Sequence, residues 1–201
     1  MEGESTFRIT VIVLFVSVLA TGLYHRVRAA RSAEKISRRE EGLPVMILLR
    51  LFGFSTWMGL LLYMVNPRWM AWSHLSLPPW LRWVGAGVGI VAVPLIAWMF
   101  MSLGKNVTDT VAIRREHRLV THGPYRWVRH PMYSFSFLAL VGFALLSANW
   151  FIGLTGILAL VVLAVRTPIE ETKLIEEFGD EYRAYMRRTG RFLPRLKLDP
   201  E

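Results

Sequence analysis

Residues 132–165 read MYSFSFLALVGFALLSANWFIGLTGILALVVLAV, a predominantly apolar block. A block of this length is too long for one helix across a hydrocarbon core of about 30 Å and suits two helices. We therefore predict a helical hairpin that turns near Asn149 and Trp150. Because so tight a turn makes the two helices antiparallel, the segments before and after the block are expected at the same membrane surface.

Two polar, charge-rich clusters flank this block. The first, residues 119–133, reads LVTHGPYRWVRHPMY, and the second, residues 166–185, reads RTPIEETKLIEEFGDEYRAY. Since the hairpin brings the chain back to the surface that it left, both clusters are expected at one face of the bilayer. A polar pocket at a membrane surface favours chemistry between a charged, soluble cofactor and a lipophilic substrate.

Three further apolar runs precede the hairpin, near residues 7–25, 43–65 and 80–103. Together with the hairpin they predict an all-α integral membrane bundle of about five transmembrane helices, followed by a cytoplasmic C-terminal helix. The 201 residues, 53% of them hydrophobic, are expected to form a single membrane domain over residues 1–201. The chain has no cysteine, which excludes disulfides, thiolate metal sites and cysteine nucleophiles.

The net charge of +9 would suit either nucleic acid or acidic lipid as a partner. The basic residues cluster in the loops beside the apolar runs, which favours topology signalling and membrane lipids over nucleic acid. The first apolar run follows an acidic segment and precedes a basic one, so we expect an uncleaved anchor with its N-terminus outside. The basic segments 104–131 and 166–197 then predict that the polar clusters and the C-terminus are cytoplasmic.

Two patterns that suggest ligand sites have simpler explanations. Residues 85–89, GAGVG, loosely match a nucleotide-binding fingerprint, but they lie in an expected span and we assign them to close helix packing. His117, His122 and His130 match no common zinc spacing, so no metal site is expected.

The first polar cluster has features of an anion site. Gly123 and Pro124 predict a turn, and Pro131 suits the first turn of a helix, whose free N–H groups attract anions. A basic, aromatic interface belt is the alternative explanation. Three aromatic side chains of this cluster offer flat faces for a purine ring: Tyr125, Trp127 and Tyr133.

In the second cluster, Arg166 and Glu170 follow the expected fifth span. Taken alone, Arg166 could be a topology anchor, and residues 167–170 could form a capping box with proline at the first helical position. Across the hairpin from the first cluster, however, the Glu170 carboxylate would suit the cationic groups of a zwitterion such as S-adenosylmethionine.

The segment 169–188 predicts a helix with one apolar face. Such a helix either docks on the bundle or lies in the membrane interface. Its apolar stripe consists of Leu174, Phe178, Tyr182, Tyr185 and Met186.

Together the two clusters resemble the isoprenylcysteine carboxyl methyltransferase family and its bacterial relatives, whose general design the phospholipid methyltransferases share. The resemblance rests on HRLVTHGPYRWVRHPMY, the apolar hairpin and then R-T-x-x-E-E-x-x-L-x-x-x-F-G-x-E-Y-x-x-Y, within residues 104–195. It implies an integral membrane methyltransferase that uses S-adenosylmethionine, with residues 104–195 as its methyltransferase core.

The resemblance also implies the roles of particular residues. Arg166 would bind the substrate and act with Glu170 as the catalytic pair. Thr110 and Phe135 depart from the family pattern, which has glutamine and glycine there, so a bulkier pocket floor and a different substrate are expected. The residues implied to hold the cofactor are His117, Arg118, Leu119, Val120, Tyr125, His130, Pro131, Met132, Tyr133 and Glu170.

The methyl acceptor remains open between several chemistries. A carboxylate needs no general base at neutral pH and could be held by Arg166, which favours a prenylcysteine-like acceptor that enters from the bilayer. A phospholipid amine or a small thiol would need a base, with Glu171 or His130 as candidates. A non-catalytic scaffold or transporter subunit predicts functional charges inside the spans, where we count only Arg50 near one end.

Overall fold

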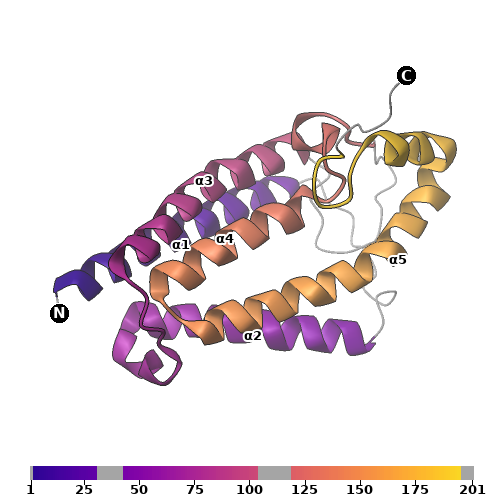
Figure 1. The fold of residues 1–201 in the computed structure, drawn as a ribbon. Coiled ribbons are helices and arrows are strands. Elements are labelled where there is room, and N and C mark those ends of the chain that lie inside the picture. The colour runs from indigo at the N-terminus through magenta and orange to yellow at the C-terminus, as the bar shows by residue number, and fades with distance from the viewer. Residues whose placement is uncertain (1, 31–42, 104–118, 196–201) are drawn as a thin grey trace.

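The computed structural model describes residues 2–30, 43–103 and 119–195 (Figure 1). Within these residues the secondary structure is helical, apart from two isolated β-bridges, so the predicted all-α class is confirmed. The elements in chain order are α1 (Glu2–Ala30), α2 (Leu43–Val65), the 3-10 helix η1 (Pro67–Ser73), α3 (Pro79–Leu103), the 3-10 helix η3 (Gly123–Arg126), α4 (Pro131–Ser147) and α5 (Trp150–Arg188).

The predicted hairpin is present, and it turns at the expected residues. The helix α4 ends at Ser147, and Ala148 adopts the left-handed conformation with φ of 48°. Asn149 then caps α5, since its side chain accepts a hydrogen bond from the Ile152 N–H at 3.1 Å. The Asn149 amide also donates to Ser73 Oγ at 2.8 Å, which ties the hairpin turn to η1.

Four of the described helices are long and apolar enough to cross a membrane. They are α1, α2, α3 and α5. The remaining helix of the hairpin, α4, is apolar but has 17 residues, which is a length of about 25 Å and the lower limit for a span. The expected count of about five spans therefore holds as four full-length helices and one short partner.

The tail helix begins later than the sequence predicted, because the membrane helix runs on past residue 169 and the chain leaves helical geometry only at Gly179. The helix α5 continues through Pro168 to Arg188, and the Thr167 hydroxyl donates to the Leu163 carbonyl at 3.2 Å inside the helix. Thr167 therefore does not begin a new helix, and the capping-box interpretation was wrong. The bend in α5 comes later, at Gly179, whose φ of 54° and ψ of −127° suit a residue without a Cβ atom.

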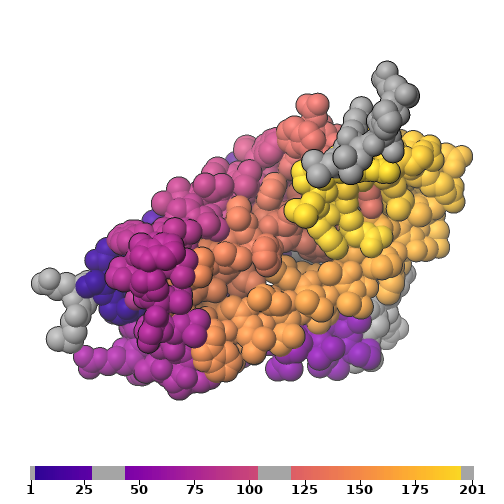
Figure 2. Space-filling model, in the orientation of Figure 1, coloured from indigo at the N-terminus to yellow at the C-terminus, as the bar shows by residue number. Residues whose placement is uncertain are grey.

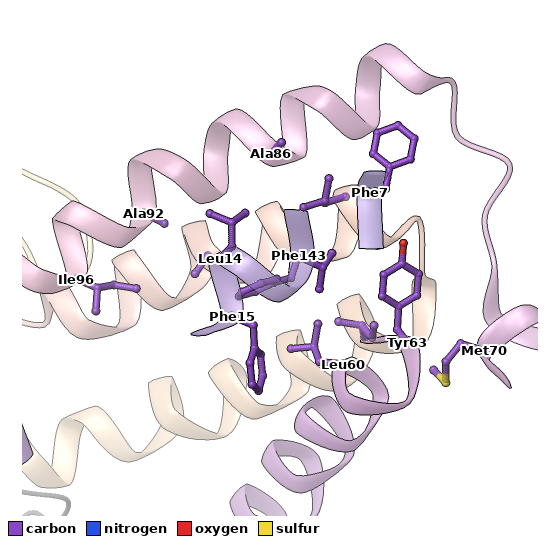
Figure 3. Packing of buried hydrophobic residues seen from close by; sticks show 14 residues of the cluster. Phe7, Leu14, Phe15, Leu60, Tyr63, Met70, Ala86, Ala92, Ile96 and Phe143 are labelled. Carbon is purple, nitrogen blue, oxygen red and sulfur yellow. The ribbon is translucent and has the colours of Figure 1, made fainter. Parts of the chain in front are cut away.

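The helices pack around one apolar core (Figure 3). Helices α3 and α4 meet through small residues: a Cβ atom on Gly85 would lie 2.7 Å from the Leu146 backbone N, and one on Gly142 would lie 2.9 Å from that of Gly89. The GAGVG segment therefore serves helix packing, as the sequence predicted. Among the buried core side chains are Phe7, Leu14 and Phe15 of α1, Leu60 and Tyr63 of α2, Ala86 and Ile96 of α3 and Phe143 of α4.

The end of the bundle that holds the N-terminus has its own buried charge network. Arg82, which is 6% exposed, donates to Glu4 Oε2 at 2.7 Å and to the Leu146 carbonyl at 3.0 Å. The Tyr63 hydroxyl donates to the same carboxylate at 2.7 Å. The sequence analysis overlooked Arg82 as a charge within a span. In the structure it joins α1, α2 and α3 at this end.

Candidate functional site

The two polar clusters lie together at the other end of the bundle, away from the N-terminus (Figures 1 and 2). The helix α4 begins there and α5 finishes there, because the hairpin between them makes the two helices antiparallel (Figure 1). The tail of α5 packs on the turn before α4, where the Tyr185 hydroxyl donates to the Tyr125 carbonyl at 2.6 Å. The apolar stripe of the tail is therefore docked on the bundle, with Tyr182 and Tyr185 buried.

Glu170 connects the two clusters across the hairpin. Its Oε2 atom accepts a hydrogen bond from the Tyr133 hydroxyl at 2.9 Å. Its other oxygen lies 3.9 Å from His130 Nδ1, beyond hydrogen-bonding distance. The His130 and Tyr133 rings stack with centroids 5.4 Å apart and planes 4° from parallel. As far as the described part of the chain goes, this second oxygen of Glu170 accepts no hydrogen bond, so it can accept a ligand cation beside the stacked pair of rings.

The neighbouring carboxylate, Glu171, is held by cations of the protein. Arg129 Nε and Arg191 Nη2 lie 2.9 Å and 2.5 Å from its oxygens. His130 Nε2 lies 3.4 Å away without hydrogen-bond geometry. Glu171 follows the apolar segment that ends at residue 165. Burial alone would raise the pKa of Glu171, but the contacts with His130, Arg191 and Arg129 outweigh burial and lower it to about 2.

Arg166 lies one helical turn before Glu170, so the two side chains share a face of α5. It is 8% exposed, which is unusual for a residue that only marks a membrane surface. Glu170 in turn accepts the hydrogen bond of the Tyr133 hydroxyl. The site therefore combines a buried cation, a carboxylate and a phenol within one small region.

Two buried polar atoms of this region have no hydrogen-bond partner among the described residues, namely His130 Nε2 and the Tyr182 hydroxyl. Tyr182 is 1% exposed. Because buried polar atoms are normally hydrogen-bonded, these two atoms fit a site that receives a polar ligand. Together with the second oxygen of Glu170, they would suit a ligand that carries both cationic groups and hydroxyls.

The two aromatic residues of the turn before α4, Tyr125 and Trp127, differ in their burial. Gly123 begins η3 with φ of 61°, and Tyr125 is half-buried beneath the tail of α5. Burial, with smaller effects of Tyr185 and Glu170, raises the pKa of Tyr125, so its hydroxyl stays protonated. Trp127 is 45% exposed and packs edge-on against Trp98 at 5.7 Å. Trp127 therefore fits the interface belt better than a cofactor pocket.

The structure brings five of the predicted site residues together: Tyr125, His130, Tyr133, Arg166 and Glu170. The remaining predicted residues are placed less directly. Pro131 is buried as the first residue of α4, Met132 is 42% exposed, and Leu119 and Val120 are half-buried before η3. Phe135 packs against the apolar core. His117, Arg118 and Thr110 lie outside the described residues.

Sequence reasoning missed the segment after α5, residues 189–195, which we call the C-terminal strap. The backbone N–H groups of Arg129 and His130 donate to the carbonyls of Gly190 and Arg191 at 2.8 Å and 3.0 Å. The strap therefore lies against the turn that leads into α4. Gly190 and Pro194 signal the end of a helix, but no local pattern shows where the chain goes next.

Comparison with known proteins supports the resemblance seen in the sequence. The phospholipid methyltransferase family model matches residues 80–181. The protein-S-isoprenylcysteine O-methyltransferase of Rattus norvegicus is 33% identical over 131 residues, which are 63% of this chain and 45% of that protein. The methanethiol S-methyltransferase of Pseudomonas deceptionensis is 25% identical over 200 residues, covering 94% of this chain and 76% of that protein.

A solved structure with the same fold is the eukaryotic intramembrane Ras methyltransferase, an isoprenylcysteine carboxyl methyltransferase. It superimposes with a TM-score of 0.54 at 22% identity, over 92% of this chain and 67% of that one. At 22% identity, this similarity shows that the two proteins share a fold and no more. The chain spans less than half the length of the mammalian isoprenylcysteine relatives that it matches.

Proposed function

The chain belongs to the phospholipid methyltransferase family, and from this membership we propose that it transfers the methyl group of S-adenosylmethionine to a lipophilic acceptor at the membrane surface. The observation that carries the proposal is the hydrogen bond from Tyr133 to Glu170. It joins the two motifs, which are far apart in the sequence, at one end of a helical hairpin. The resulting site has a carboxylate for a cationic cofactor and a buried arginine beside it.

In this proposal Glu170 binds a cationic group of the cofactor through its free oxygen. His130 Nε2 and the Tyr182 hydroxyl supply further polar contacts, because both are buried and lack a partner among the described residues. Tyr125 and Tyr133 provide ring faces. The cofactor supplies an activated methyl group on a sulfonium, and the protein supplies its orientation.

The proposed acceptor is a carboxylate, as in a prenylcysteine-like group. With S-adenosylmethionine bound, an oxygen of this carboxylate would accept the methyl group, and the electron pair of the broken carbon–sulfur bond would stay on sulfur. Arg166 would hold the carboxylate in line with that bond, and such positioning accounts for much of the acceleration in a displacement of this kind. The reaction removes no proton, since the carboxylate is already ionised at neutral pH.

The geometry of Glu171 also favours an acidic acceptor. A thiol or an amine would need a general base, and Glu171 was one candidate. His130, Arg191 and Arg129 outweigh the effect of burial and lower the pKa of this carboxylate to about 2, so it is a weak base that is already committed to structural contacts. His130 is then the base that remains for a thiol or amine acceptor.

A small thiol is the second candidate acceptor, because the similarity to the methanethiol S-methyltransferase covers nearly the whole chain. Assays with a farnesylated N-acetylcysteine, phosphatidylethanolamine vesicles and methanethiol would separate the alternatives. Turnover of methanethiol without turnover of the farnesylated acid would favour the thiol.

The test of the proposal is calorimetric titration of S-adenosylmethionine into the detergent-purified protein. We expect saturable binding that Glu170→Gln weakens about ten- to a hundredfold, as is typical for the loss of a charged hydrogen-bonding partner. Glu177→Gln is the matched control, because Glu177 lies exposed on the same helix.

Three outcomes would count against the proposal. Absence of binding by the folded wild-type protein would refute the methyltransferase function itself. Equal affinities of wild type and Glu170→Gln would remove the role given to Glu170, and equal losses in both variants would show that the effect is one of net charge.

A further inference from the structure

The C-terminal strap is fixed to the site at several points. Besides the two backbone hydrogen bonds from Arg129 and His130, the Gly190 N–H donates to the Trp127 carbonyl at 3.1 Å. Arg129 Nη1 donates to the Thr189 carbonyl, and Arg191 pairs with Glu171. A segment held by so many contacts within a few residues has one defined path, although its outer side is exposed.

This path places the ring of Phe192 against the two aromatic rings of the proposed cofactor site. The Phe192 centroid lies 5.8 Å from that of Tyr133 and 6.1 Å from that of His130, with planes inclined by 51° and 52°. The backbone carbonyl of Phe192 accepts a hydrogen bond from the Ser134 hydroxyl, which fixes the backbone from which the ring extends. The three rings thus form one cluster, and two of its members are proposed cofactor ligands.

We propose that Phe192 is a positioning residue of the cofactor site. Its ring limits rotation of the Tyr133 and His130 rings, and so it keeps the Tyr133 hydroxyl directed at Glu170 and the His130 ring stacked on Tyr133. A binding site whose groups are already oriented loses less freedom when the ligand arrives. The family match ends at residue 181, so this role lies outside the matched region.

The inference rests on the proposed use of S-adenosylmethionine, and it is tested with variants that change the ring alone. Phe192→Leu keeps an apolar side chain of similar size but removes the aromatic faces, whereas Phe192→Tyr keeps them. Leu193→Ala is the matched control, because Leu193 is the next strap residue and is 76% exposed. All four proteins are compared by calorimetry, by thermal unfolding and by turnover over a range of cofactor concentrations.

We expect Phe192→Leu to weaken cofactor binding about three- to tenfold, the range for loss of an aromatic pair, and to raise the KM for the cofactor with kcat preserved. Phe192→Tyr and Leu193→Ala should bind as the wild type does. A merely structural role would lower the unfolding temperature and the amount of active protein without such a split between KM and kcat.

Each other pattern would overturn the inference in a recognisable way. Wild-type affinity in Phe192→Leu, with the wild type binding, would remove the role of Phe192 and leave the proposed function intact. Equal weakening in Phe192→Leu and Leu193→Ala would assign the effect to the strap as a whole. A wild type that binds no S-adenosylmethionine would refute the proposed function and this inference together.

Discussion

Glu170 and Glu171 are adjacent in the sequence, yet the structure gives them opposite tasks. Glu171 meets Arg129 and Arg191 and is 3% exposed, so its charge is already compensated inside the protein. Glu170 accepts one hydrogen bond from Tyr133 and keeps an oxygen available. Because neighbouring residues of a helix point about 100° apart, a change of one position decides whether a carboxylate meets the two arginines or the Tyr133 hydroxyl.

At the same scale, we expect a division of roles, in which Arg166 acts on the acceptor and Glu170 acts on the cofactor. Arg166→Ala is expected to lower kcat with a farnesylated cysteine acceptor by about a hundredfold or more, while the cofactor affinity stays nearly constant. The reason is that Arg166 is proposed to hold the acceptor rather than the cofactor. Single-turnover kinetics beside calorimetry would measure the two effects separately.

Arg183→Ala is the control for this experiment, since Arg183 lies on the same helix with an exposed side chain that pairs only with Asp180 among the described contacts. Equal losses of cofactor binding and of turnover in Arg166→Ala would contradict the division. Arg166→Lys should recover part of the rate, because it restores the charge without the planar fork.

At the scale of elements, α5 includes both a membrane helix and part of the candidate site, which the sequence predicted as two separate helices. Its first half is an apolar membrane helix and its second half carries Arg166, Glu170 and the docked tail. Continuity through Pro168 makes the register between the two halves rigid. The positions of the site residues therefore depend on how the hairpin packs. That packing includes the close contact of α3 with α4 at Gly85 and Gly142.

This packing predicts a sharp difference between two glycines of α3. Gly85→Ala should destabilise the protein by about 1–3 kcal/mol, because the new Cβ would lie 2.7 Å from backbone and side-chain atoms of α4. The unfolding midpoint in detergent should fall by roughly 2–4 °C for each kcal/mol. Gly87→Ala should be neutral or slightly stabilising, since nothing lies within 4 Å of its Cβ position and alanine favours the helix.

Thermal unfolding of the two variants in the same detergent measures this difference. A Gly85→Ala protein as stable as the Gly87→Ala protein would show that α3 and α4 are not in the close contact described.

At the scale of the whole molecule, the charges are separated between the two ends of the bundle. One end holds the Glu4, Tyr63 and Arg82 network, and the other holds the candidate site (Figure 1). In the first network the polar groups bond to one another and to the Leu146 carbonyl, so that α1, α2, α3 and α4 are joined. In the second, the buried His130 Nε2 atom and the Tyr182 hydroxyl have no hydrogen-bond partner within residues 2–30, 43–103 and 119–195, as expected of groups that contact a polar ligand.

We propose that the end with the candidate site faces the cytoplasm, as the distribution of basic residues predicts. The chain has no cysteine, so single-cysteine variants have no background reactivity. Glu176→Cys should react with a membrane-impermeant maleimide only after cells are permeabilised. Ser76→Cys, in the loop at the other end, should react in intact cells. The reverse pattern of labelling would place the site outside.

Several features of this protein could be predicted from local sequence alone. The length of the block 132–165 determined a hairpin, since a backbone in hydrocarbon must hydrogen-bond within its own helices. Asn149 and Pro131 marked the bounds of the two helices, and the hairpin in turn required that the two motifs meet at one end. The roles expected of His130, Tyr133, Arg166 and Glu170 came from the resemblance to the methyltransferase family.

Only the tertiary structure decided which partners the side chains of the site contact. The path of residues 189–195 depends on hydrogen bonds to residues some sixty positions earlier in the sequence. No periodic sequence pattern predicts such bonds. The same holds for the burial of Glu171, the orphaned hydroxyl of Tyr182 and the continuity of α5 past Pro168. Helix formation follows from neighbouring residues, whereas the partner that a side chain finds depends on distances that arise only when the helices are packed.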